Sequence, residues 1–274
     1  MPIYLTGYID DHTDRLKSYH DDILPLGMIV QPKTHREGYL RRAGLYGWVA
    51  IDNGRFTDAG RRLFRPADYA RLVGEGLERA GDHLLFATAP DVPFDWAATL
   101  RLSRPWLRRI RRMGCPAALC AQEGMTPASI PWDEFDCLFV GGADAFKEGP
   151  IVRDACREAR RRGKWVHMGR VNGLRRLRVA LGFGVDSVDG TYLLHEARKG
   201  RACQAPQDVV SWLRQVHADR RRELRRGLER LGVGSDRIDA ILGQRRGPGL
   251  SGLLPGDTGQ GGVINTIPGP EHIP

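Results

Sequence analysis

The chain has 274 residues, of which 41% are hydrophobic and 27% charged, as is typical of a globular protein with a core of ordinary size. No apolar run approaches the roughly 20 residues that span a bilayer, and the first residues lack a basic-then-apolar signal, so we expect no membrane partner and a cytoplasmic location. The formal net charge of +9 favours a polyanionic partner, above all nucleic acid, although arginine runs are also typical of solvated helix faces.

The expected strands are eight short apolar segments in the first 195 residues. They are residues 3–8, 28–31, 48–51, 84–89, 117–121, 137–140, 165–168 and 187–192. Helical patterns separate most of them, at residues 66–79, 94–113, 151–162 and 174–183. This alternation predicts an α/β fold, a compact (β/α)8 TIM-type barrel over residues 1–205. An open doubly wound sheet is the alternative, but no G-x-G-x-x-G follows the first strand, which disfavours a dinucleotide-binding sheet.

The pattern changes after residue 205. Residues 207–230 predict one long helix with an apolar stripe and arginine-rich faces, and residues 235–242 a short helix with Ser235 as its N-cap. We therefore expect a basic helical extension over residues 206–246. Residues 247–274 are rich in Gly and Pro with little to bury, which predicts a disordered tail.

The ends of the predicted strands carry polar residues or glycine. These are Asp52, Asp91, Gln122, Gly141, Gly142, Met168 and Asp189. Each alone fits an ordinary turn or cap, but in a barrel the carboxyl ends of the strands meet at one rim, where such enzymes carry their chemistry.

The set has a chemical meaning. A carboxylate, an amide and a free backbone N–H can read the Watson–Crick edge of guanine, and glycine lets the base approach closely. Two further aspartates suit displacement at an anomeric carbon, one as nucleophile and one as acid/base. A glycoside hydrolase barrel is an alternative, but it would not need the amide and the glycines.

Five motifs run in order through residues 48–192. They are WVAIDNGRF (48–56), APD (89–91), FVGGADAFKE (139–148), VHMGRVN (166–172) and GVDSVDGTY (184–192). With them the chain resembles the tRNA-guanine transglycosylase superfamily, most closely its short DNA-acting branch, the deoxypurine-in-DNA protein A group of phages and bacterial DNA-modification clusters. The resemblance implies exchange of guanine in DNA for a 7-deazaguanine such as preQ0, in the host cytoplasm if the protein is phage-encoded, with partner proteins of a modification system as a further expectation. Exchange in tRNA, or a non-catalytic nucleic-acid-binding paralogue, are the alternatives.

The resemblance also assigns roles to residues. It implies that Asp189 is the nucleophile and Asp52 the acid/base, that Asp91, Gln122 and the Gly141-Gly142 pair hold the purine, and that Met168 packs on it. Lys147 and Glu148 lie one residue out of register with the acidic position of the family.

One departure from the family concerns zinc. The tRNA enzymes follow their nucleophile with a Cys-x-Cys-x-x-Cys…His zinc site, whereas only Cys203 of the five scattered cysteines follows Asp189 here. We therefore expect no metal or cofactor, and we interpret His195 and His217 as ordinary polar residues. This difference favours the DNA-acting branch.

A nucleic-acid substrate needs cations beside an acidic rim. A stacked base must be flipped out or supplied single-stranded, and the flanking phosphates must then be held. The candidates are Arg170, Arg175, Arg176 and Arg178, expected beside the rim, with Arg220, Arg221 and Arg222 of the C-terminal helix.

Overall fold

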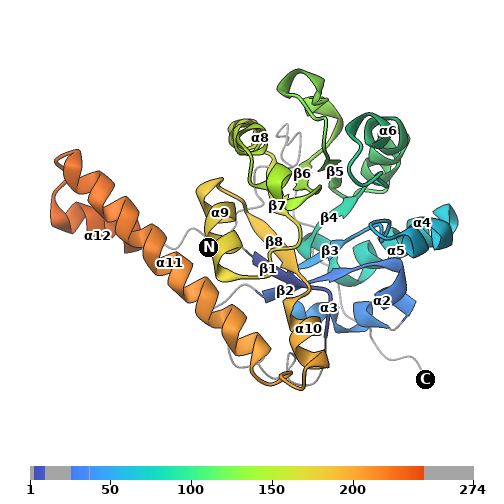
Figure 1. Ribbon diagram of the computed structural model, residues 1–274, viewed down its shortest axis with the longest axis horizontal. Helices are drawn as coiled ribbons and strands as arrows, with labels where there is room; N and C mark the ends of the chain where they lie inside the picture. The colour runs from blue at the N-terminus through green and yellow to red at the C-terminus, as the bar shows by residue number, and fades with distance from the viewer. Residues whose placement is uncertain (1–2, 10–25, 37, 244–274) are drawn as a thin grey trace, which may run out of the picture.

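The strands form a closed barrel in a computed structural model that describes residues 3–9, 26–36 and 38–243. Eight parallel strands pair in sequence order, and β8 pairs with β1 to close the ring (Figure 1). The strands are β1 (Ile3–Thr6), β2 (Leu26–Val30), β3 (Val49–Ile51), β4 (Leu84–Thr88), β5 (Ala117–Ala121), β6 (Cys137–Val140), β7 (Trp165–Met168) and β8 (Ser187–Gly190). The predicted (β/α)8 TIM-type fold is thereby confirmed.

Helices surround the barrel, and short elements fill the connections that lacked a regular pattern. The helices are α2 (Pro32–Arg36), α3 (Ala43–Tyr46), α4 (Asp58–Leu63), α5 (Pro66–Ala80), α6 (Trp96–Arg112), α7 (Asp144–Lys147), α8 (Pro150–Arg161), α9 (Leu174–Gly182), α10 (Tyr192–Arg198), α11 (Ala205–Arg230) and α12 (Ser235–Gly243). Single 3₁₀ turns lie at Tyr39–Arg42, Gly81–His83, Pro127–Ser129 and Trp132–Glu134. None of these described helices has both the length and the apolar character of a membrane span.

Local sequence explains where the helices begin and end. Pro66 occupies the first turn of α5, where its missing N–H costs nothing, and the helix ends before Gly81, whose φ is +51°. Asp95 caps α6 by accepting a hydrogen bond from the N–H of Ala98 at 2.9 Å. The last strand is shorter than predicted, because the chain leaves the barrel after Gly190 and turns into α10.

Two apolar cores hold the barrel together. One fills its lumen with side chains such as Leu5, Ala50 and Phe86, and the other lies between the strands and the helices. Successive side chains of a strand point to opposite faces, so most strands contribute to both cores, whereas β8 turns the polar Ser187 and Asp189 inward. The inward positions at the carboxyl ends of the strands therefore line the rim.

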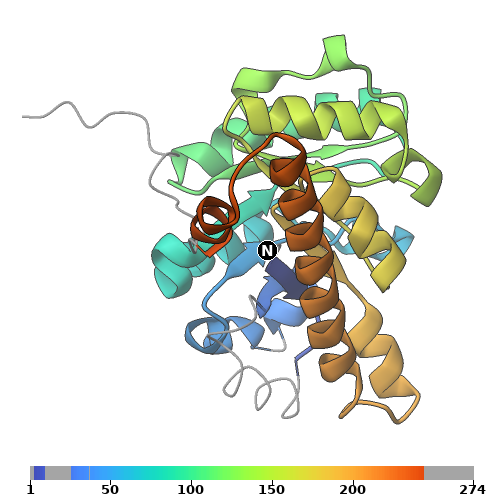
Figure 2. The ribbon, with the colours of Figure 1, turned by 90° about the vertical axis from the view of Figure 1, so that its left-hand side faces the viewer.

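Only the first half of helix α11 packs against the barrel. In its first half Val209, Leu213 and Val216 are buried, and the helix packs on α9 and α10. Its second half projects past the barrel and carries α12 (Figures 1 and 2). There the predicted apolar stripe is not covered, since Leu224 is 41% exposed and Leu231 80% exposed. The predicted boundary at residue 206 thus falls inside α11, and the predicted tail lies outside the described residues.

Candidate active site

The barrel brings most of the predicted site residues to one rim. Asp52, Asp91 and Gln122 follow β3, β4 and β5, the Gly141-Gly142 pair follows β6, and Asp189 lies in β8 near its end. The negative charges of Asp91 and Asp189 both raise the pKa of Asp52, so the three carboxylates share one electrostatic environment.

Asp52 is partly buried and carries a perturbed carboxyl group. Its pKa is raised to about 7, first by burial and then by the charges of Asp91 and Asp189. One oxygen accepts a hydrogen bond from the N–H of Gly54 at 3.1 Å, as an ordinary turn aspartate would, and the other lies 3.4 Å from the Thr88 hydroxyl. A pKa in this range allows the group both to give and to take a proton near neutral pH.

Asp91 stands in a fixed frame of amides. Its Oδ1 accepts from Asn53 Nδ2 at 3.0 Å and its Oδ2 from Gln122 Nε2 at 2.6 Å. The Gln122 carbonyl in turn accepts from the N–H of Phe94 at 3.0 Å. Burial raises the pKa of Asp91, and the two amides counteract that shift. Asn53 was not predicted, although it directly follows Asp52 and precedes a turn glycine.

The two glycines after β6 pack directly on the residues that follow β5. A Cβ at Gly141 would lie 2.8 Å from Gln122 Nε2, and one at Gly142 would lie 2.7 Å from a carboxylate oxygen of Glu123. Gly142 also has φ +79°, which favours glycine. The N–H of Gly141 donates to Ala121, whereas that of Gly142 has no partner among the described residues. One backbone donor is therefore available here.

Asp189 is held by two groups from the end of β7. The N–H of Arg170 donates to Oδ1 at 3.2 Å, and Nε2 of His167 lies 2.9 Å from Oδ2. Arg170 has φ +59°, an uncommon conformation for a residue with a side chain, and this backbone turn aims its N–H at the carboxylate. His167 is fully buried, with the ring of Phe139 4.5 Å away. No role was predicted for His167, although the period of two along β7 places it on the same face as Trp165, which packs against the lumen core.

Met168 does not contact a base from its place in the structure. His167 takes the inward position of β7, so Met168, one residue later, faces outward and is fully buried in the core between strands and helices. The predicted contact of Met168 with the purine is therefore wrong.

Two exposed aromatic rings stand at the mouth of the site. Phe56 and Phe94 are 47% and 51% exposed, and their rings meet edge to face with centroids 6.0 Å apart. The guanidinium carbon of Arg170 lies 4.4 Å from the centre of the Phe56 ring. Apolar rings exposed beside Asp52 and Gln122 offer a surface on which a base can stack. Neither ring was predicted, although Phe56 lies in one of the motifs.

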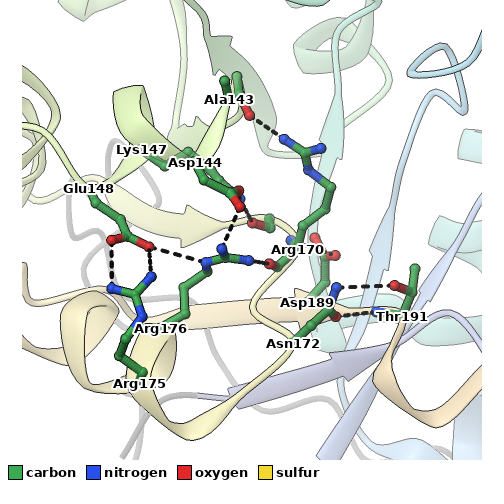
Figure 3. Close-up of polar contacts among 12 residues, drawn as sticks. Ala143, Asp144, Lys147, Glu148, Arg170, Asn172, Arg175, Arg176, Asp189 and Thr191 are labelled. Carbon is green, nitrogen blue, oxygen red and sulfur yellow. Dashed lines mark hydrogen bonds and ion pairs between the residues drawn. The ribbon is translucent and has the colours of Figure 1, made fainter. Parts of the chain in front are cut away.

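A network of charges ties the loop after β6 to the loop after β7 (Figure 3). Arg175 forks onto Glu148 with bonds of 2.8 and 2.6 Å, and Arg176 bridges Glu148 and Asp144. The fully buried Lys147 donates to the Gly169 carbonyl at 3.0 Å, and burial lowers its pKa. These interactions give Lys147 and Glu148 a structural place, and they fix the loops that carry Gly142 and Arg170.

The predicted arginines do not form one patch beside the rim. Arg178 turns away to α11, where it pairs with Asp219 at 3.2 Å. Together with Arg220 and Arg222 it lines a hollow of about 260 Å³ between α9 and α11. Because α9 runs from the end of β7 back to the start of β8, the end of α9 that borders this hollow lies at the opposite end of the barrel. Arg221 is exposed on the same stretch of α11.

Comparisons with known proteins bear on the fold. No protein-family model matches the sequence, and no curated protein does. A solved structure described as native KDPGal is 13% identical with a TM-score of 0.50, and covers 78% of this chain and 94% of its own. A cube-shaped, highly porous protein cage designed by fusing symmetric oligomeric domains is 13% identical with a TM-score of 0.53, with coverage of 88% and 83%. At this identity the likeness shows the fold alone.

The described ranges hold no group of side chains suited to a metal ion. Nowhere in them do three His, Cys, Asp or Glu side chains converge as a metal site would require.

Proposed function

We propose that the protein is a pentosyltransferase that exchanges guanine in DNA for a 7-deazaguanine through a covalent aspartyl-glycosyl intermediate. The observation that carries this proposal is the pairing of two unlike carboxylates on one rim. Asp189 accepts the backbone N–H of Arg170 and lies beside His167, whereas Asp52 has a pKa of about 7. One is suited to attack carbon, and the other to move a proton.

The exchange balances with these two groups. In the first half, an Asp189 oxygen bonds to C1′ of the nucleotide and the C1′–N9 bond breaks. The guanine leaves with the electron pair of that bond, and its nitrogen receives a proton from Asp52. In the second half, the incoming base gives its N–H proton to the Asp52 carboxylate and its nitrogen bonds to C1′. The C1′–O bond to Asp189 then breaks, and both side chains return to their first state.

The frame around Asp91 supports a purine as the base. A carboxylate can accept from N1–H and N2–H₂ of guanine, while the free N–H of Gly142 can donate to O6. Asp91 is held in place by Asn53 and Gln122, so this edge is ordered before a base binds. The exposed Phe56 ring can cover the face of the base.

Nucleic acid as the carrier of that base is supported by charge. The net charge of +9 suits a phosphodiester chain, and a base can reach carboxylates on a barrel rim only when it is flipped out or single-stranded. DNA is preferred over tRNA because the sequence lacks the cysteine-rich segment of the tRNA enzymes.

Nucleoside analysis tests the proposal. DNA and tRNA from cells that express the protein and are supplied with preQ0 are digested separately, and their nucleosides are identified by mass spectrometry, with Asp189→Asn as the matched control. We expect a 7-deazaguanine nucleoside in DNA of the wild-type culture alone. The same nucleoside confined to tRNA would establish the alternative substrate, and its absence from both pools would refute base exchange.

A further inference from the structure

Four polar side chains, the last of them Asp189, form a continuous row of hydrogen bonds in the barrel lumen. The indole Nε1 of Trp165 donates to Ser187 Oγ at 2.8 Å. Ser187 Oγ lies 2.8 Å from His167 Nδ1, and His167 Nε2 lies 2.9 Å from Asp189 Oδ2. Ser187 and His167 are fully buried.

The indole of Trp165 sets which group donates and which accepts in this row of hydrogen bonds. An indole N–H can only donate, so it occupies one lone pair of the Ser187 oxygen. The Ser187 hydroxyl has a single hydrogen, and within the described part of the chain His167 Nδ1 is the acceptor in its reach. A buried hydroxyl left without an acceptor is costly, so the hydrogen points to Nδ1.

The direction then sets the histidine tautomer. With Nδ1 accepting, the ring hydrogen lies on Nε2 and donates to Asp189 Oδ2. The opposite tautomer would set two lone pairs against each other across 2.9 Å. A doubly protonated ring would point a second hydrogen at Ser187 and leave the serine hydrogen without an acceptor. Phe86 and Phe139 flank the ring and offer no other polar partner.

We propose that His167 is a positioning residue for the nucleophile, held as the neutral Nε2–H tautomer by Trp165 and Ser187. This inference rests on the proposed function, because only there is Asp189 a nucleophile. The N–H bonds of His167 and Arg170 fix the rotation of the carboxylate, so that its remaining lone pairs face the sugar. They also stabilise the carboxylate that returns when the C1′–O bond breaks, as preorganised donors do at developing anions.

Kinetics of the full-length protein test the positioning role. His167→Gln keeps an N–H near the place of Nε2, whereas His167→Leu keeps volume and removes the donor. Phe86→Leu is the packing control, because this ring touches His167 without bonding to it. With a guanine-containing oligonucleotide and labelled guanine, we expect His167→Leu to lower kcat by roughly 10²–10³-fold with KM unchanged. His167→Gln should recover most of this loss, and Phe86→Leu should stay within a few-fold of wild type.

The tautomer is measured without reference to activity. In protein labelled with ¹⁵N-histidine, the His167 ring is assigned among the eight histidines by its loss in His167→Gln. We expect the Nε2–H form in the wild type, and a mixture of tautomers in Ser187→Ala and in Trp165→Phe, which also serve if His167→Leu fails to fold.

Each outcome decides one of the two claims. A wild-type ring protonated at Nδ1, or full activity of His167→Leu, overturns the positioning role. Absence of exchange in the wild type, with the Nε2–H form present, instead refutes the proposed function and leaves the hydrogen-bonded chain as a structural finding.

Discussion

The two ends of the barrel use arginine differently. At the rim, Arg175 and Arg176 are held by carboxylates of the barrel itself, and Arg170 reaches the Gly142 carbonyl. At the other end, the hollow between α9 and α11 is lined by two carboxylates, Asp219 and Glu223, and by four arginines, Arg178, Arg220, Arg222 and Arg226. A second hollow of about 190 Å³ continues it along α8, lined by Arg153, Arg157 and Arg160.

At the rim the arginines order the loops of the site, whereas at the α11 end Arg220 and Arg222 pair, within the described part of the chain, only with carboxylates of their own helix. Bidentate pairs such as Arg175 with Glu148 order the loops that carry Gly142 and Arg170. Arg226 has no partner among the described residues, and its charge is therefore free to meet phosphate. The rim and the α11 end should respond to mutation in different ways.

Replacing the nucleophile should have the largest effect. Asp189→Asn removes the carboxylate that bonds to C1′ in the proposed exchange, so we expect loss of base exchange below detection with an unchanged unfolding temperature. Exchange is measured as incorporation of labelled guanine into an oligonucleotide. Near-wild-type incorporation by this variant would contradict the assignment.

Removing the proton donor should have the next largest effect. Asp52→Asn is expected to slow exchange by roughly 10²–10⁴-fold. In the proposed exchange Asp52 must be protonated to assist the leaving base, so the wild-type rate of guanine release should fall as pH rises through about 7. The same pH profile measured on Asp52→Asn should lack this fall, and a fall that persists would assign it to another group.

The same substitution should stabilise the fold at high pH. The pKa of Asp52 is raised from 3.8 to about 7, so its charged form is disfavoured in the folded protein. The stability associated with the neutral form is present below pH ~4 and is lost as pH rises through about 7. Denaturation at pH ~5 and pH ~8 should show Asp52→Asn gaining on wild type by up to about 3 kcal/mol, because about two pH units separate pH ~5 from the folded pKa of about 7 and each unit is worth about 1.36 kcal/mol. An equal difference at both pH values would contradict the burial of this group.

Removing Asp91, which would bind the base in the proposed exchange, should have a smaller effect. Asp91→Ala leaves the amides of Asn53 and Gln122 without their acceptor, and we expect affinity for the free base to fall by roughly 1–3 kcal/mol. Calorimetric titration of guanine and preQ0 measures it, with Asp58→Ala on the exposed helix α4 as control. Unchanged affinity for both bases would show that Asp91 does not bind them.

Charge reversal should give the smallest effect, and the effect should differ between the α11 end and the rim of the barrel. Arg220→Glu with Arg226→Glu should reduce the salt slope of DNA binding by about one unit for each phosphate that is no longer bound. Arg175→Glu should instead lower the unfolding temperature, because it breaks the pair with Glu148. Arg108→Glu on the exposed face of α6 is the matched control. If the α11 variant binds DNA with the wild-type salt slope, these arginines are only a solvated surface.

The sequence predicts the barrel well, because strand and helix periods are local signals. The same periods put Asp52, Gln122 and Asp189 near strand ends, where a barrel must bring them together. The errors come from features that need three dimensions. Met168 was misplaced because one residue of register exchanges inside for outside. Arg178 was misplaced because α9 leads away from the rim, so a residue near its far end lies toward the opposite end of the barrel.

Buried polar groups were the least predictable. Lys147 is fully buried against the Gly169 carbonyl, although lysine is ordinarily exposed. One partner, Asp144 at 3.2 Å, lies three residues earlier on α7, but the Gly169 carbonyl comes from a distant segment, and no local pattern predicts that contact. The chain from Trp165 to Asp189 likewise joins β7 and β8, and becomes visible only when the two strands pair.

The proposed exchange requires Asp189 to carry the sugar between the two bases. Its most direct test is peptide mass spectrometry of the wild-type protein quenched in acid after mixing with a guanine-containing oligonucleotide. We expect a nucleotide adduct on Asp189 that disappears when free base is added before the quench, and that is absent from Asp189→Asn. Exchange of the base without any adduct, or an adduct on a different residue, would contradict this role of Asp189.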